Sequence, residues 1–177
     1  MSTRNFFKYI LLTLFLIGCS VSPLPVSQHR QAQLVHTLQK LDHTVPQQEA
    51  QLLSHDLFDK TAKLTKAFEL TSPPWFHNVL VNVGLRKKGL CFHWADALYA
   101  YLVKKEYPHF AFHLAGANIG EYFFEHNVLV VTSKDGKFEE GIVIDPWRDS
   151  GKLYFSKLKE DKKYIWKHRV KREYIQK

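Results

Sequence analysis

The stretch Gly89-Leu90-Cys91-Phe92-His93-Trp94-Ala95-Asp96-Ala97-Leu98 decides how this chain of 177 residues is interpreted. From Cys91 onward, apolar residues recur at helical spacing, which predicts a helix that ends before Pro108. Gly89 permits a tight entry into that helix. The first turn of a helix presents unpaired N–H groups and the positive end of its dipole, and both favour a thiolate. The sequence therefore predicts a reactive Cys91, in contrast to a buried, inert thiol.

Two polar residues lie at the ends of later apolar stretches. His126 begins one predicted strand and Asp145 ends the next, just before Pro146. The turn at residues 134–137 makes these strands hairpin neighbours, so the two side chains can meet. A carboxylate beside an imidazole fixes the ring tautomer and stabilises the imidazolium, and the imidazole can activate a thiol. A lone histidine is usually structural, so the prediction rests on Cys91, His126 and Asp145 together.

The order of the other elements predicts the fold class. Two helices come first, at residues 29–42 and after Pro46, and Pro73-Pro74 is predicted to end the second helix and open a loop. Strands are predicted after the Cys91 helix, at residues 110–114, 126–131, 141–145, 153–155 and 164–166. Helices followed by antiparallel strands indicate an α+β fold. We expect one domain over 29–177, with N-terminal helices at 29–70 and the core at about 75–177.

Residues 1–18 have the layout of a secretory signal. Arg4 and Lys8 precede an apolar run at residues 9–17, which is too short to cross a bilayer. Leu16-Ile17-Gly18-Cys19 resembles the bacterial lipobox, which implies cleavage before Cys19 and a lipid thioether on its sulfur. Residues 19–28 are then expected to be a tether that holds the domain on a membrane. Ser20 resembles the outer-membrane sorting pattern, so we expect a position in the cell envelope, facing the periplasm if the host has two membranes.

Three short motifs together resemble the bacterial transglutaminase-like superfamily. They are Gly89-x-Cys91-x-x-x-Ala95 opening a helix, His126-Asn127-Val128-Leu129-Val130 on a strand, and Val143-Ile144-Asp145-Pro146-Trp147 on the next. The resemblance covers about residues 75–150. It implies a papain-like fold in which the nucleophile helix packs on an antiparallel sheet. It also implies that Cys91 is the nucleophile, His126 the general base and then acid, and Asp145 the orienting carboxylate.

The chain departs from that pattern in two places. The strand after His126 lacks the Trp and Glu that are common there, and Leu85 stands where papain-like peptidases have a Gln six residues before the nucleophile. The backbone N–H of Cys91 is expected to be one oxyanion donor. The second donor is left open between Asn78, Asn82 and Trp75, for which packing in a loop is the alternative.

Composition and spacing argue against other kinds of site. Cys91, His93, His113, His126 and Asp145 are metal-ligand types, but they lack the close pairs of a structural zinc site, so we expect no metal and no cofactor. The formal charge of +8 is concentrated at residues 157–177. We interpret these cations as solvated, with an anionic surface as the alternative, and expect no nucleic-acid partner.

The expected activity is acyl transfer at an amide through a thioester. Hydrolysis of a peptide, isopeptide or side-chain amide is expected ahead of crosslinking to an amine, because water is always present. The expected partners are the membrane, through Cys19, and a peptide or protein substrate in the cell envelope. The alternative is a non-catalytic lipoprotein that uses a papain-like domain for binding or assembly. The oligomeric state is left open.

Overall fold

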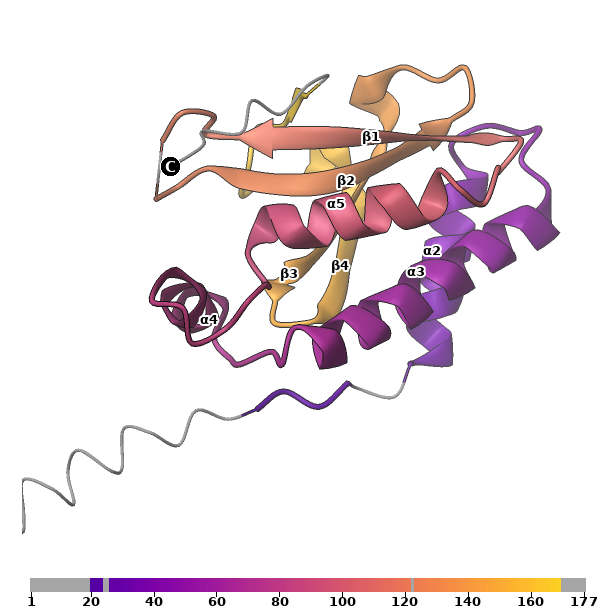
Figure 1. Ribbon diagram of the computed structural model, residues 1–177. Helices are drawn as coiled ribbons and strands as arrows, with labels where there is room; N and C mark the ends of the chain where they lie inside the picture. The colour runs from indigo at the N-terminus through magenta and orange to yellow at the C-terminus, as the bar shows by residue number, and fades with distance from the viewer. Residues whose placement is uncertain (1–19, 24–25, 122, 170–177) are drawn as a thin grey trace, which may run out of the picture.

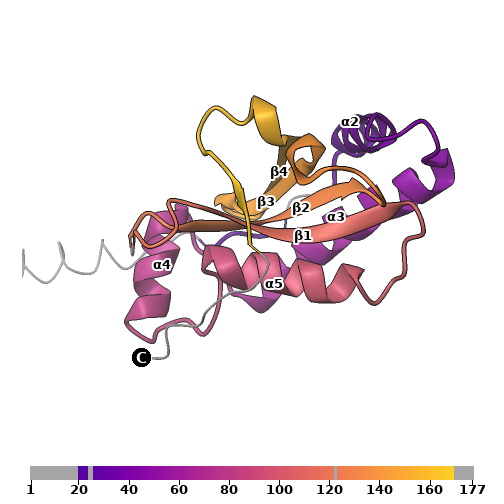
Figure 2. The ribbon, with the colours of Figure 1, turned by 90° about the horizontal axis from the view of Figure 1, so that it is seen from above.

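The computed structural model describes residues 20–23, 26–121 and 123–169. Within these ranges the chain folds into four α-helices and one five-stranded antiparallel sheet (Figures 1 and 2), which confirms the predicted α+β class. The predicted signal segment and Cys19 lie outside the described residues. None of the described helices has the length and the apolar composition that crossing a membrane requires.

Helices α2 (Gln28–Gln39) and α3 (Gln47–Ala67) form the first layer, as predicted. Ser27 caps α2 by accepting a hydrogen bond from the N–H of Arg30, and Pro46 precedes the first turn of α3, where its missing N–H costs nothing. Their apolar faces meet, burying Leu34, Leu38, Ala50, Leu53 and Leu57 completely. This layer supports the helix that carries the cysteine.

Helix α4 (Pro74–Asn82) corrects the prediction that Pro73-Pro74 opens a loop. Pro74 occupies the first helical position, where a proline is favourable because no hydrogen bond is lost there. The buried side chain of His77 fastens α4 to its surroundings. Its Nδ1 accepts a hydrogen bond from the N–H of Thr71 (3.1 Å), and its Nε2 donates to the carbonyl of Lys88 (2.9 Å).

The sheet has the strand order β4-β3-β2-β1-β5. Its strands are β1 (Phe110–Ala117), β2 (His126–Ser133), β3 (Ile142–Asp149), β4 (Lys152–Lys157) and β5 (Lys167–His168). Helix α5 (Cys91–Leu102) begins at Cys91 as predicted and packs on one face of the sheet (Figure 2), where Leu129 and Ile144 contribute to the main core. Val128 and Val143 face the other side, under Trp166.

The bounds of all the predicted strands change in the structure, and two strands differ most. Strand β3 does not end at Pro146 but continues to Asp149, with an irregular register between Asp145 and Asp149 that accommodates the proline. The predicted strand at residues 164–166 is absent, and the pairing with β1 is made instead by the two residues of β5. Tyr164 and Trp166 therefore lie in the segment that leads into β5, and their side chains cover the sheet.

The segment that follows Cys19 contacts the domain at once. Ser20 forms an isolated β-bridge with Thr71, and the N–H of Val21 donates to the carbonyl of Leu70 (2.8 Å). Val21 also packs against the main core. The first two described residues of the expected tether are thus paired with the loop that joins α3 to α4.

Candidate active site

The loop before Cys91 is positioned by a close approach between Gly89 and His77. Gly89 has a φ of +125°, and a Cβ added there would collide with the imidazole ring of His77. Only glycine allows both the backbone angle and this contact. The hydrogen bonds at both ring nitrogens leave His77 neutral, and burial lowers its pKa. A structural histidine on α4 therefore determines the start of the cysteine helix.

His93 caps the N-terminus of α5. Its Nδ1 accepts hydrogen bonds from the N–H groups of Gly89 and Leu90, both at 3.2 Å, in the manner of the acceptor at the third position of a capping box. Cys91 is the first residue of the helix, where a backbone N–H has no acceptor within the helix. His93 thus accepts the hydrogen bonds of the Gly89 and Leu90 N–H groups. The N–H of Cys91 remains a donor beside its own sulfur.

His126 and Asp145 form a buried pair. The Nε2 of His126 lies 2.7 Å from the Oδ2 of Asp145, and their exposed fractions are 2 % and 1 %. Because Nε2 is committed to the carboxylate, Nδ1 is the ring atom left for a thiol. Cys91 supplies that thiol, because its side chain lies close enough to His126 to raise the pKa of the ring. The structure therefore brings Cys91, His126 and Asp145 together.

Aromatic side chains enclose the imidazole of His126. Its ring centroid lies 4.7 Å from that of Trp147, 4.8 Å from that of Tyr164 and 5.5 Å from that of Trp166. His126 has the same strand parity as Val128, so it shares the sheet face covered by Trp166, while α5 covers the opposite face. Although α5 and His126 lie on opposite faces, Cys91 is the first residue of α5 and His126 the first residue of β2. Thiol and imidazole therefore meet at the end of the sheet where β2 begins.

A chain of alternating charges orients Asp145. Arg148 donates to it from the backbone N–H (3.1 Å) and from Nε (2.9 Å), while both guanidinium Nη atoms bind Asp161 at 3.1 and 2.6 Å. The guanidinium also stacks on Tyr154, 3.9 Å from the ring centroid. Trp166 donates from Nε1 to Asp161 (2.9 Å). The bidentate pair of Arg148 with Asp161 thereby links the Asp145 carboxylate to the segment whose side chains cover His126.

A second polar group touches the sulfur. The Nδ2 of Asn127 lies 3.9 Å from the Sγ of Cys91, which itself lies 3.9 Å from the carbonyl oxygen of Glu125. Arg169 donates from Nη1 to the Oδ1 of Asn127 (2.9 Å) and to the carboxylate of Glu125, so the amide is fixed with its N–H groups toward the sulfur. Cys91 is 9 % exposed, yet its neighbours are polar. Asn127 and Arg169 were missed by sequence reasoning.

These contacts alter the proton affinity of His126. Burial lowers the pKa of the ring, but the hydrogen bonds with Asp145 and Cys91, together with their negative charge, outweigh burial and raise the pKa to about 9. Burial likewise opposes the ionisation of Asp145, while His126 and Arg148 hold the pKa of that carboxyl below its ordinary value. At neutral pH the pair is therefore an imidazolium and a carboxylate.

The three oxyanion candidates lie on α4 and differ in their surroundings. Asn78 accepts a hydrogen bond at Oδ1 from the Nε1 of Trp147 (3.0 Å), so it is one contact away from the His126 ring. Asn82 is exposed, and Trp75 is 65 % exposed. None of the three has a recorded contact with Cys91 among the described residues, whereas Asn127 does.

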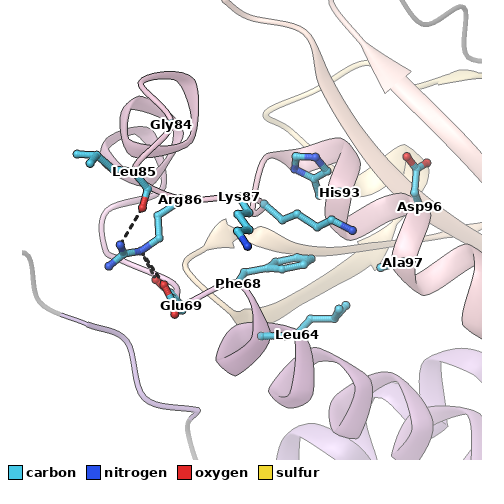
Figure 3. A pocket seen from close by; sticks show the side chains of 12 residues that line it. Leu64, Phe68, Glu69, Gly84, Leu85, Arg86, Lys87, His93, Asp96 and Ala97 are labelled. Carbon is cyan, nitrogen blue, oxygen red and sulfur yellow. Dashed lines mark hydrogen bonds and ion pairs between the residues drawn. The ribbon is translucent and has the colours of Figure 1, made fainter.

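A cavity of about 900 Å³ lies on another side of α5 (Figure 3). Leu64, Phe68 and Ala97 give it apolar walls, and residues 84–88, His93 and Asp96 line the rest. No residue of the Cys91, His126 and Asp145 group lines it, so this cavity is separate from the candidate site. Among the described residues no cluster of three or more His, Cys, Asp or Glu side chains has the arrangement of a metal site.

The geometry describes a cysteine at a helix N-terminus, an imidazolium held by a buried carboxylate, and an amide aimed at the sulfur. Comparison of the chain with models of protein families, with curated proteins and with solved structures finds no match.

Proposed function

We propose that the protein is a membrane-anchored cysteine hydrolase or acyltransferase of the transglutaminase-like, papain-like type. Its substrate is an amide, either of a peptide, an isopeptide or a side chain. The observation that carries the proposal is the buried 2.7 Å contact between His126 and Asp145, with the Cys91 side chain close enough to raise the pKa of the same ring. Two other observations, the position of Cys91 at the start of α5 and the amide of Asn127 at its sulfur, support it.

The imidazole of His126 transfers a proton in each of two steps: it gives one to the leaving amine and later takes one from the attacking water. The thiolate of Cys91 attacks the amide carbon, and the imidazolium of His126 protonates the leaving nitrogen as the C–N bond breaks. A thioester and a free amine result. Water then gives a proton to His126 and attacks the thioester, releasing a carboxylic acid and the thiolate. An amine in place of water would give a crosslink.

Asn127 is proposed as the second oxyanion donor, in place of the three candidates on α4. The backbone N–H of Cys91 and the Nδ2 of Asn127 both lie beside the sulfur, where the oxygen of a tetrahedral intermediate forms. Arg169 fixes the amide orientation by binding its Oδ1. Removing one such donor costs on the order of a hundredfold in turnover.

Alkylation of Cys91 by iodoacetamide near neutral pH tests the proposal. We expect rapid modification in the folded protein, detected by mass spectrometry, and modification at least about 100-fold slower in His126→Gln and Asp145→Asn. His36→Gln, an exposed histidine on α2, is the matched control and should react like the wild type. Asn127→Ala, which removes the amide that contacts the sulfur, should slow alkylation much less than His126→Gln does.

The 9 % exposure of Cys91 favours one other function, a non-catalytic lipoprotein in which the domain serves binding or assembly. A thiol that reacts with iodoacetamide only after the protein is unfolded in urea would support this alternative and contradict the enzyme.

A further inference from the structure

Helix α4 has an apolar face that points to solvent. Trp75 and Val79 on α4 and Val83 at its C-cap are 65 %, 47 % and 63 % exposed and follow one another at intervals of four residues, so they form one line. The opposite side carries the buried His77. We call the line of these three side chains the α4 stripe. Exposed apolar side chains that lie together in this way are typical of a surface that contacts a protein or a membrane.

The N-terminal part of the chain reaches the domain next to this stripe. Ser20 pairs with Thr71, which lies three residues before Pro74, the first residue of α4. Figure 1 shows this first segment beside the loop that joins α3 to α4. The apolar run at residues 9–17 precedes it in the sequence. Whatever holds that N-terminal part on a membrane therefore holds the start of α4 close to the same membrane.

Cations follow the stripe in the sequence. Arg86 is engaged with Glu69, donating from Nε to its carbonyl (3.1 Å), as Figure 3 shows. Lys87 and Lys88 are exposed, and no ion pair is recorded for either within the described ranges. These two exposed lysines, which also line the cavity beside α5, follow Val83 by four and five positions in the sequence.

We propose that the α4 stripe, with Lys87 and Lys88, lies on the surface of an anionic lipid bilayer. An amphipathic helix binds a membrane with its apolar face in the interface, and neighbouring lysines bind anionic headgroups. A tryptophan is favoured at that depth because its ring is apolar and its N–H is polar. The loop between β1 and β2, with Phe124 69 % exposed, lies at the same end of the molecule in Figures 1 and 2.

The inference shares the membrane attachment with the proposed function but does not depend on its chemistry. The reactivity of Cys91 tests the enzyme, and the depth of Trp75 tests the docking, so either can fail alone. Trp94 and Trp166 are buried and Trp147 is half-buried, which makes Trp75 the tryptophan on which a lipid quencher can report.

The test uses the full chain in vesicles of phosphatidylglycerol and phosphatidylethanolamine that carry brominated acyl chains. We expect bromine to quench part of the tryptophan emission, and Trp75→Phe to remove that quenchable part. The double variant Val79→Asp, Val83→Asp should lose most of the quenching while it stays bound through the N-terminal segment. Lys87→Glu with Lys88→Glu should weaken quenching in these vesicles but not in phosphatidylcholine vesicles, where it is weaker from the outset.

Leu52→Asp is the matched control, because Leu52 is a comparably exposed apolar residue on α3 and its loss should leave the quenching unchanged. Circular dichroism shows whether each variant is folded, and Trp75→Phe keeps the test valid if the aspartate variants are not. If aqueous iodide quenches Trp75 equally with and without vesicles, the stripe does not lie on lipid. A protein partner would then be its occupant, and the proposal would be overturned.

Discussion

Position 89 must be a glycine for two independent reasons. Its φ of +125° disfavours any side chain, and a Cβ would also strike the ring of His77. Gly84 has a φ of +80° but no atom within 4 Å of an added Cβ. A substitution at Gly84 therefore introduces backbone strain alone, whereas one at Gly89 introduces backbone strain and a steric clash.

We expect Gly84→Ala to lower the free energy of unfolding by about 1–2 kcal/mol, which is the cost of a left-handed backbone alone. Gly89→Ala should cost about 3 kcal/mol or more, because overpacking adds to that strain. Urea unfolding of both variants measures the difference. Equal losses would mean that the His77 contact does not hold the loop.

His126 carries its raised pKa through contacts that a conservative change can remove. In Asp145→Asn the hydrogen bond remains possible but the negative charge is lost, while burial still lowers the pKa of the ring. We expect the His126 pKa to fall from about 9 toward 6.5 or below. Titration of the ring nitrogens by NMR measures it, and the distant His77, which should keep its lowered pKa in the variant, is the internal control.

At the scale of elements, the segment from Asp161 to β5 is held by one carboxylate. Asp161 accepts hydrogen bonds from Arg148, Trp166 and the N–H of Lys163, so it positions the aromatic rings that cover His126. Burial opposes its ionisation, but Arg148 and Trp166 hold the pKa of its carboxyl below the ordinary value. The cover of the candidate site thus depends on a charge pair far from the thiol in sequence.

Asp161→Ala should destabilise the fold by about 3 kcal/mol, because it leaves the buried guanidinium of Arg148 with one carboxylate fewer. Trypsin should then cleave more rapidly after Lys162, Lys163 or Lys167. The neighbouring Glu160→Ala removes only an exposed pair with Lys157 and should change stability by less than about 0.5 kcal/mol. Unchanged proteolysis in Asp161→Ala would show that the segment is held by other contacts.

Sequence reasoning was most successful where a pattern is long or local. The long helix α3 and the cysteine helix α5 follow from apolar spacing, and the hairpin of β2 and β3 follows from its turn. Helix α4 was missed because it has nine residues and begins with two prolines, which are typical both of a loop and of a first helical turn. The α+β class needed only the order of elements.

The supporting residues of the site could not be predicted, because their contacts join distant parts of the chain. Arg148 reaches Asp161, and Arg169 reaches Asn127 across 42 positions. Each is an ordinary charged residue in the sequence, and no spacing links it to its partner. The one available signal was Asn127 itself, which directly follows His126 in the motif that carries the resemblance.

For the whole molecule, His126 makes stability depend on pH on the alkaline side. Its pKa is raised from 6.5 when the protein is unfolded to about 9 when it is folded. The protonated ring therefore contributes stability that is fully present below pH 6.5 and is lost as the pH rises to about 9. The contribution corresponds to about 3 kcal/mol.

Urea unfolding at pH 6.5 and pH 9.5 should show this loss in the wild type. Asp145→Asn should show a much smaller difference between the two pH values, because its ring no longer holds the proton. A wild-type stability that is constant over this range would mean that the imidazolium is not preferentially stabilised by the fold.

The pairing of Ser20 with Thr71 has a consequence for reach. An acyl group on Cys19 would be joined to the domain by almost no free chain, because the next residue, Ser20, is already paired with the loop before α4. A domain of this size has a radius of gyration of about 15 Å and hence a diameter of about 40 Å, so the sulfur of Cys91 would lie within about 40 Å of the headgroups. If the proposed function holds, an amide bond farther from the membrane than this would be out of reach of Cys91.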